Sequence, residues 1–524
     1  MAYASASLLH STGCHEPVAG RLFERSLPGA DVFPDGAVFP KATLARPPGA
    51  LIYRLTREIP PLKVEVAERK PNRIVEILEF GYEDYTRSRC LPAHVREAAQ
   101  MILRCRTSAL GGHVEACPDG HIARIHYNSC GHRFCPRCGY RKRQHWIAQQ
   151  REKLLPVRHF HVTFTIPRAF NDLWWQNVTQ MAEYLFHAAA QALQELLADP
   201  ERVGVQIGIV SSLHTWDDRL RRHPHLHCLV TGGGLTPAGV WKDSYKPGDR
   251  PFLVPGKPLM QHFRKLFCRK VEHAVRRGIV KLPKGCRRQQ MLNLIHKVNR
   301  TDWQVYIAKP PEDGGPTTEE ILEYQAKAVA GGPLSDVRIE GIERTVSAWQ
   351  AGIQACQEPQ LRYVSELSLP ASRVQEVSPH EVSFRWGTYD QETGRRVRDQ
   401  TETLPLETFL RRLFWHVPPP GLHTIRQYGL YSTPKKAQCE QCRALLPKTS
   451  PADAERIGTV GQGTNAEGRL PLEEFMAQRS RCPICGKPLA ITRVIPSSVT
   501  GKLSPRDKAF ARKLSRTRMR RRGG

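Results

Sequence analysis

The stretch His223-Pro224-His225-Leu226-His227-Cys228-Leu229-Val230 decides the fold predicted for this chain. Side chains of a β-strand alternate between its two faces with a period of two residues. His225 and His227 therefore share one face, whereas Leu226 and Cys228 point to the opposite face, which can be buried. Two neighbouring imidazoles on an open sheet face predict a metal site, although a histidine-rich surface strand would show the same motif.

The segments around this stretch predict an antiparallel sheet. Residues 159–166 alternate between apolar and polar side chains, which predicts a half-buried strand. Residues 203–216 predict a second strand, and the pair Asp217-Asp218 forms the turn that leads into the histidine-rich strand. Asn171 is expected to cap one long helix that ends before Pro200. The two histidines are therefore expected on a central strand of an antiparallel sheet packed by helices, in an α+β fold.

Further helices and strands are predicted from the same patterns. Thr317 and Glu320 form a capping box that begins a helix over 317–330, which Gly331-Gly332-Pro333 ends. Three other helices are expected over 92–106, 141–155 and 404–416. Short strands are expected at 303–307, 338–340 and 382–386. The first of these strands would place Tyr306 in the core.

The charge balance favours a polyanionic partner. The 524 residues contain 78 Lys and Arg against 50 Asp and Glu, a net charge of +28. An excess of this size is typical of proteins that bind nucleic acid, with ribosomal or membrane-surface binding as the alternative. The sequence contains no run of about 18 apolar residues, so no membrane span is predicted. The N-terminal residues lack the basic segment of a signal peptide.

The cysteine usage predicts structural zinc in a reducing compartment. The chain has 15 cysteines, most of them in two short-spaced groups, which is typical of metal ligands rather than of a disulfide framework. In the first group, Cys135-Pro-Arg-Cys138 is a CxxC turn that offers two thiolates to one ion. Cys117 and His121 are the expected second pair, but the spacing leaves Cys130 and His132 open as ligands.

The second cysteine group predicts a zinc ribbon. Cys439-Glu-Gln-Cys442 and Cys482-Pro-Ile-Cys485 are two CxxC turns, and a Gly-rich loop over 458–468 accounts for their wide separation. Because both sites would be closed by protein ligands, the zinc ions, about two per chain, are expected to be structural rather than catalytic.

A catalytic role for the face that carries His225 and His227 requires a nucleophile. Tyr324 lies in the middle of the helix predicted over 317–330, where an isolated tyrosine is more often a core or surface residue. A tyrosine phenol can attack a phosphodiester and form a covalent phosphotyrosine. A divalent ion, Mg²⁺ or Mn²⁺, on the two histidines would polarise the phosphate. His161 and Gln325 are both candidates for a third metal ligand.

Four blocks of the sequence resemble one protein family. They are Arg104–His113 with Tyr127–Cys130 and Cys135–Cys138, then His159–Pro167, then Leu213–Trp216 leading to His223–His227, and finally Leu422–Gly429. From about Leu91 to Cys485, the chain thereby resembles the rolling-circle insertion-sequence transposases of the IS91 family, which belong to the HUH nuclease superfamily. Two histidines separated by one apolar residue are the signature of that superfamily, whose members nick single-stranded DNA with a tyrosine.

The resemblance implies a bacterial transposase, cytoplasmic and nucleoid-associated. Such an enzyme nicks and rejoins single-stranded, hairpin-containing DNA at element ends through a 5′-phosphotyrosine, here on Tyr324. Many members carry two tyrosines four residues apart. Ala328 stands at the second position in this chain, so we expect a single-tyrosine enzyme that reuses Tyr324 or borrows a tyrosine within a homodimer. The expected DNA contacts are Arg137, Arg141, Lys142, Arg143 and Lys327.

Two other functions fit the same residues. A relaxase or replication initiator would use the same chemistry on a different DNA substrate. A non-catalytic DNA-binding protein would need only the zinc modules and the basic surface. The missing second tyrosine keeps this second alternative open, and a strand-cleavage assay distinguishes it from an enzyme.

The predicted domain organisation places the nuclease between zinc-binding modules. Its segments are an N-terminal arm, partly disordered (1–90), a zinc-binding domain with a basic helix (91–155), an HUH tyrosine nuclease domain (156–345), a C-terminal part of the transposase domain (346–436), a zinc ribbon (437–490) and a basic tail (491–524).

Overall fold

The computed structural model describes residues 73–245, 252–333, 339–344, 379–389, 396–446, 480–482, 484–505, 507–509 and 511. The chain divides into two units, 1–67 and 68–524, and every described residue belongs to the second. Most of the arm predicted for 1–90 therefore lies outside the described residues. Its last part contains helix α2 (Arg73–Arg87), most of whose apolar side chains are buried.

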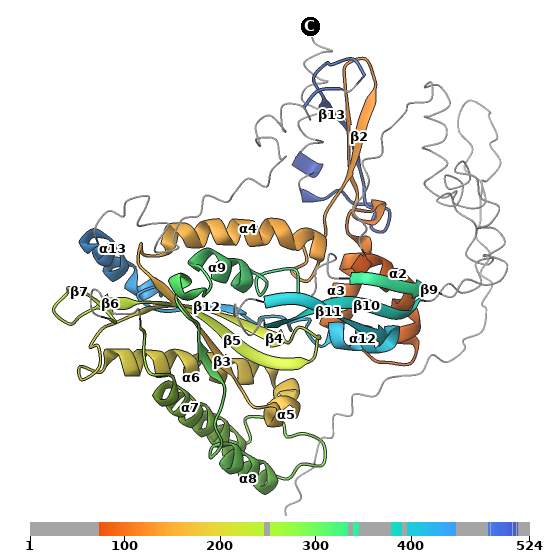
Figure 1. Ribbon diagram of the computed structural model, residues 1–524. Helices are drawn as coiled ribbons and strands as arrows, with labels where there is room; N and C mark the ends of the chain where they lie inside the picture. The colour runs from red at the N-terminus through yellow and green to blue at the C-terminus, as the bar shows by residue number, and fades with distance from the viewer. Residues whose placement is uncertain are drawn as a thin grey trace, which may run out of the picture. The chain divides into compact units, whose positions relative to one another are not determined.

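A five-stranded antiparallel sheet carries the histidine motif (Figure 1). Its strand order is β12 (Ile425–Gly429), β4 (Gly208–Trp216), β5 (Arg222–Thr231), β3 (His159–Thr165) and β8 (Val305–Ile307). Each neighbouring pair is antiparallel, and β5 lies in the centre. The prediction of a central, antiparallel histidine-rich strand is thus confirmed.

The two faces of this sheet bury different side chains. On one face, Leu226, Cys228 and Val230 join a large apolar core formed with α6 (Val178–Ala198), α7 (Gly256–Arg277) and α8 (Arg288–Val298). Figure 1 shows these helices on one side of the sheet and α4 (Pro136–Lys153) and α9 (Thr318–Ala326) on the other. On that second face Leu229 packs against Ile321 and Leu322 of α9. The period-two alternation therefore places the histidines beneath α9.

Two sequence-based expectations about these elements are wrong. The long helix from Asn171 is broken at Asn177, whose φ of −141° and ψ of 42° are not helical, so α5 (Asn171–Gln176) and α6 are separate. Tyr306 is not in the core, because β8 is an edge strand and the side chain of Tyr306 is 61% exposed.

A second core lies around the zinc-binding segment. It joins α2, α3 (Ala93–Arg104) and α12 (Leu406–Phe414) to the antiparallel sheet β11-β10-β9. That sheet consists of Arg396–Pro405, Pro379–Tyr389 and Ile339–Arg344. The observed strands β9 and β10 are longer than those predicted at 338–340 and 382–386, and the observed helix α12 is shorter than the one predicted over 404–416.

A third sheet joins distant parts of the chain. Strand β1 (Gly112–Ala116) pairs with β2 (Ile122–Tyr127) on one side and with β13 (Ala490–Ile495) on the other. Asp507 is fully buried, and its carboxylate accepts a hydrogen bond from the Asn128 side-chain amide. The described residues of the predicted basic tail are therefore folded against the zinc-binding domain rather than extended from it.

The zinc-binding segment also contacts the loop that follows α9. Gly331 donates a backbone hydrogen bond to the Arg133 carbonyl at 2.7 Å. A Cβ atom on Gly139 in α4 would lie 2.8 Å from the Gly331 Cα, so the two backbones pack too closely for a side chain at Gly139. The side chain of Arg133 donates further hydrogen bonds to Ala328 and Leu422.

The remaining described elements are short. A two-stranded ribbon consists of β6 (Gly233–Leu235) and β7 (Trp241–Asp243), and α13 spans Lys436–Leu445. Within the described residues, every helix is too short or too polar to cross a bilayer.

Candidate functional site

Three histidines meet on the α9 side of the main sheet. His225 and His227 lie on β5, and His214 lies on β4, directly opposite His225 in the strand register. One nitrogen from each ring lies within 4.8 Å of the others, and all three residues are buried. His225 and His227 therefore lie together on one face, and His214 is a third member of the cluster that sequence reasoning missed.

Hydrogen bonds orient two of these rings. The Nδ1–H of His225 donates to the carbonyl of His223 at 2.7 Å, which leaves the lone pair on Nε2. The Nδ1 of His227 lies 2.9 Å from the Nε2 of His161. The Nε2 of His227 is buried and has no hydrogen-bond partner among the described residues. Such bonds fix which nitrogen faces a metal ion. His161 thus lies beside His227 rather than completing the three-histidine set.

Burial keeps the imidazoles of His225 and His227 neutral at physiological pH. The pKa of His225 is lowered to about 3, because burial penalises the charged ring and because His223 is close. The pKa of His227 is lowered well below its usual value, first by burial and then by His225 and His214. Neutral imidazole is the form that binds a metal ion, so the cluster fits a divalent cation.

Tyr324 lies against this cluster. Its ring centroid is 4.7 Å from that of His227 and 5.1 Å from that of His214. The ammonium of Lys327 lies 4.2 Å from the centroid of the Tyr324 ring. The capping box predicted at the start of the helix is present, since the Thr317 side chain accepts a hydrogen bond from the Glu320 backbone and the Glu320 side chain accepts one from the Thr317 backbone. Tyr324 and the histidines therefore form one site.

Gln325 fixes α9 on the sheet. Its side chain is fully buried, and its amide Nε2 donates to the carbonyls of Val210 on β4 and His227 on β5, at 2.9 and 2.8 Å. An amide that bonds both strands in this way holds the helix in register over the histidines. We therefore assign Gln325 a positioning role, in place of the metal-ligand role considered from the sequence.

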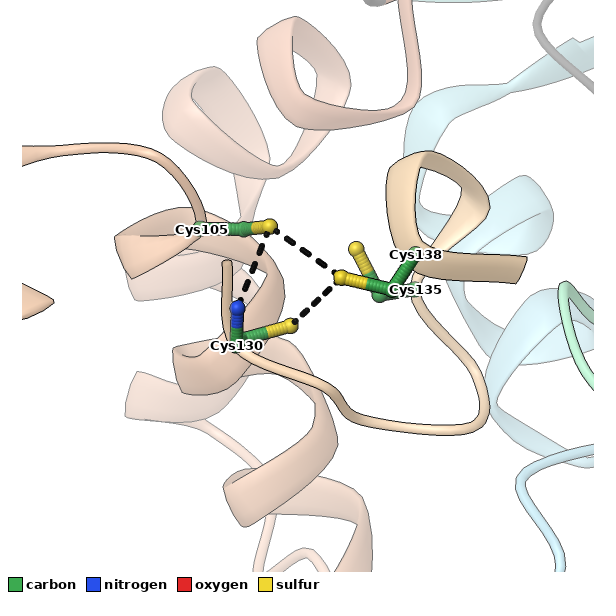
Figure 2. Close-up of side chains that lie close together, drawn as sticks. All are labelled: Cys105, Cys130, Cys135 and Cys138. Carbon is green, nitrogen blue, oxygen red and sulfur yellow. Dashed lines mark hydrogen bonds between the residues drawn. The ribbon is translucent and has the colours of Figure 1, made fainter. Parts of the chain in front are cut away.

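The first cysteine cluster contains Cys105, Cys130, Cys135 and Cys138. Figure 2 shows the four side chains converging, with Cys135 and Cys138 on one turn and Cys105 and Cys130 on other segments. The Cys138 Sγ lies 3.6 Å from that of Cys105 and 3.7 Å from that of Cys130. A tetrahedral zinc ion with bonds of about 2.3 Å would place its sulfur ligands about 3.8 Å apart. Hydrogen bonds from Cys105, Cys130 and Cys135 lower the pKa of the Cys138 thiol, so the cluster readily provides a thiolate.

The second cluster is assembled from both ends of the described chain. Cys117 and His121 lie with Cys482 and Cys485. The Cys117 Sγ is 3.4 Å from the His121 Nδ1 and 3.6 Å from the Cys485 Sγ. The pairing of β13 with β1 brings these residues together.

This grouping corrects the sequence-based assignment of the cysteines. Cys117 and His121 do not complete the Cys135–Cys138 site, because Cys105 and Cys130 lie there instead. The four-cysteine ribbon is not formed either. Cys439 and Cys442, on α13, are buried in the apolar cluster that contains Leu154 and Tyr431. Spacing alone did not reveal this, because a CxxC turn on a helix and one in a metal site look alike in sequence.

The basic residues predicted to bind DNA fall into two groups. Arg141 and Lys142 are exposed on α4. Arg137 donates to the Cys105 carbonyl at 3.0 Å, and Arg143 donates to the Ala330 carbonyl at 2.9 Å. Arg137 therefore makes a contact within the zinc-binding segment, whereas Arg143 joins that segment to the loop after α9, which removes Arg143 from the surface expected to contact phosphates.

Comparisons with known proteins agree with this architecture. A family model described as "Transposase zinc-binding domain" matches residues 77–166, and one described as "Putative transposase" matches 208–351 and 359–438. A protein of Sinorhizobium fredii named "Putative transposase y4qJ" is 33% identical over 78% of this chain and 90% of its own length. The "Transposase for insertion sequence element IS801" of Pseudomonas savastanoi pv. phaseolicola is 36% identical over 79% of this chain and 87% of its own. No solved structure matches.

These matches agree with the fold and with the site in defining a transposase. The chain belongs to the IS91 family of insertion-sequence transposases.

The buried histidine His416 predicts a pH-dependent stability. Its ring bonds Thr215 and the Leu220 carbonyl, and burial lowers its pKa to about 4. Because the unfolded chain binds this proton near pH 6.5, the free energy of unfolding falls as the pH drops from 6.5 to 4. Between pH 7 and pH 4, we expect the free energy of unfolding of His416→Gln to fall by about 3 kcal/mol less than that of the wild type. The measurement is urea unfolding at each pH. An identical loss in both proteins contradicts this assignment.

Proposed function

We propose that this transposase is an HUH-type tyrosine nuclease that cuts and rejoins single-stranded DNA at element ends through a 5′-phosphotyrosine on Tyr324. The observation that supports this most directly is the position of the Tyr324 ring, 4.7 Å from that of His227, above three clustered imidazoles. A nucleophile adjacent to a cation site is the arrangement that phosphodiester cleavage requires.

The cleavage step follows from this arrangement. The Tyr324 oxygen attacks the scissile phosphorus, a bond forms between them, and the bond from phosphorus to the 3′-oxygen breaks. The phenol loses one proton, and the departing 3′-oxygen gains one. Attack of a free 3′-hydroxyl on the phosphotyrosine reverses the step and joins a strand, so no nucleotide cofactor is needed. Lys327 is positioned to offset the negative charge on the phosphate.

His214, His225 and His227 would hold a divalent ion. Three neutral nitrogen ligands favour a transition-metal ion such as Mn²⁺ over Mg²⁺, which prefers oxygen. When bound, such an ion supplies Lewis-acid polarisation of the phosphate. His161 and the His223 carbonyl would keep the rings of His227 and His225 turned toward it.

We further propose two structural zinc ions, one on the Cys105 cluster and one on the cluster that joins Cys117 and His121 to Cys482 and Cys485. The matching zinc-binding domain and the sulfur separations support both. The second ion would link the C-terminal segment to the N-terminal domain.

Zinc content distinguishes this pairing from a C-terminal ribbon. We expect about two zinc ions per chain in reduced wild-type protein and about one after Cys482→Ser with Cys485→Ser. The matched variant, Cys439→Ser with Cys442→Ser, should retain both ions, because those cysteines lie in an apolar cluster. If both variants lose one zinc ion, the four-cysteine ribbon predicted from the sequence is correct. If both variants keep two zinc ions, the proposed second zinc site is refuted. The measurement is metal analysis by mass spectrometry.

The proposed activity is tested by incubating the full-length protein with labelled single-stranded DNA from the ends of its element. A covalent protein–DNA adduct that depends on a divalent ion supports the proposal. Binding of the DNA without any adduct, across Mg²⁺ and Mn²⁺, would instead indicate a non-catalytic DNA-binding protein.

A further inference from the structure

A cavity of about 640 Å³ opens beside the Tyr324 site. It lies between α3, the start of α6, the loop that follows α9 and the segment that follows α12, and it is lined by Lys327 and Ala328 near the tyrosine. We propose that this cavity holds one unpaired nucleotide of the DNA strand that Tyr324 cuts. This inference rests on the proposed function. The volume is within the range of sites for small organic ligands, about 300–1,000 Å³.

The lining of the cavity has the composition of a nucleotide site. It contains three tryptophans, Trp175, Trp216 and Trp415, which offer flat apolar surfaces. It also contains the cations Arg222, Arg411 and Lys327, while no aspartate or glutamate is found among the described residues that line it. Apolar ligands do not require such a charge excess, whereas a nucleotide combines a flat base with a phosphate.

Arg222 provides the strongest evidence for an anion. Its guanidinium lies over two indole rings, 5.2 Å from the centroid of Trp175 and 4.1 Å from that of Trp415. Its Nε is buried and has no hydrogen-bond partner among the residues that the structure describes. The carboxylate recorded for it is that of Asp172, 3.9 Å away on a side chain that is 81% exposed. An arginine that is held in place but weakly neutralised is suited to a phosphate.

A stack of rings connects the cavity to the metal site. Trp216 lies parallel to the ring of His214, with 4.6 Å between their centroids and 16° between their planes. Since His214 covers one face of this indole, the remainder of Trp216 lines the cavity. A base stacked on Trp216 would therefore lie one ring away from a metal ligand, which places the nucleotide next to the scissile phosphate.

The proposal is tested by removing bases one at a time from the DNA. The probe is a labelled single-stranded oligonucleotide from an element end, with an abasic site at each position in turn. The protein is full-length Tyr324→Phe, which binds without cutting, and the dissociation constant is measured by fluorescence anisotropy. We expect a loss of one particular base, beside the cleavage position, to weaken binding roughly ten- to a hundredfold.

Cavity variants identify where that base binds. In Trp415→Leu and in Arg222→Gln, each combined with Tyr324→Phe, the intact oligonucleotide should bind more weakly, and the abasic site should cause little further loss. The matched controls Trp241→Ala and Arg277→Gln, outside the cavity, should keep the full effect of the abasic site. Thermal unfolding and zinc content show whether each variant is folded. If Trp415→Leu does not fold, Arg222→Gln decides the outcome.

The outcomes separate this inference from the proposed function. If no single position matters, or if the abasic penalty is unchanged in the cavity variants, the cavity does not hold a nucleotide, even where the wild type forms an adduct. If the wild type forms no adduct but the coupling is present, the nucleotide site stands and the nuclease proposal fails. If single-stranded DNA does not bind at all, both are refuted.

Discussion

Replacing Tyr324 with phenylalanine is expected to abolish the covalent protein–DNA adduct. The substitution keeps the ring that contacts His214 and His227 but removes the oxygen that would attack phosphorus. Strand cleavage should fall at least about a thousandfold, as expected when the nucleophile of a covalent mechanism is removed. Binding of single-stranded DNA, measured by anisotropy, should change little, because the substitution removes only the phenol oxygen and leaves the positively charged side chains in place.

Tyr306→Phe is the matched control for this experiment. Tyr306 lies on the edge strand β8 with its side chain exposed, so its phenol is accessible, and β3 separates its strand from the histidine strand β5. This variant should cut DNA as the wild type does. Peptide mapping of the trapped wild-type adduct should locate the modification at residue 324. An adduct at Tyr306 would contradict the assignment of the nucleophile while leaving a tyrosine nuclease intact.

Replacing His225 and His227 together with alanine is expected to remove metal-dependent cleavage, with a loss of about a thousandfold or more. Both nitrogens face the same site, and the His214 ring alone cannot hold an ion firmly. Isothermal titration with Mn²⁺ should detect a site in the wild type and none in the double variant. His214→Ala is expected to weaken Mn²⁺ binding as well, since it removes one of three ligands.

His223→Ala serves as the control within the same strand. The hydrogen bond from His225 uses the backbone carbonyl of residue 223, which alanine retains. Mn²⁺ affinity should therefore stay close to that of the wild type. Equal loss in His223→Ala and in the double variant, or normal cleavage without His225 and His227, would refute the three-histidine site. If the double variant shows no cooperative unfolding transition, the two histidines have a structural role instead.

The sequence was sufficient to predict which residues of β5 share a face. Period-two alternation is a local property, so His225 and His227 could be assigned together, and the helix that carries Tyr324 could be recognised from its capping box. His214 could not be assigned with them, because its position opposite His225 depends on the register of two strands. The sequence predicts the turn after Trp216 but not which residues of β4 and β5 lie opposite each other. Counting residue pairs outward from that turn is the signal that points to His214.

The cysteine pairing illustrates the limit of local patterns more sharply. Cys117 meets Cys482 and Cys485 because β13 pairs with β1, a contact between segments more than 360 residues apart in sequence. Spacing rules favour neighbouring CxxC turns and so joined Cys482 to Cys439. Similarly, apolar alternation suggested that Tyr306 was buried, but an edge strand leaves one of its faces exposed. Long-range pairing, rather than propensity, decided each of these cases.

The contact between Gly139 and Gly331 would couple the proposed zinc site to the proposed nuclease site. Gly139 follows Cys138 directly, Gly331 lies on the loop that leaves the tyrosine helix, and the Arg143 guanidinium packs beside both glycines while it donates to the Ala330 carbonyl. If zinc orders the turn at Cys135–Cys138, part of that free energy would reach the loop that follows the helix of Tyr324. Such coupling is reciprocal by thermodynamic necessity. DNA bound at the tyrosine would then raise the affinity of the Cys135–Cys138 turn for zinc. The zinc affinity, measured by competition with a chelator, would therefore report from outside the active site whether a strand is bound.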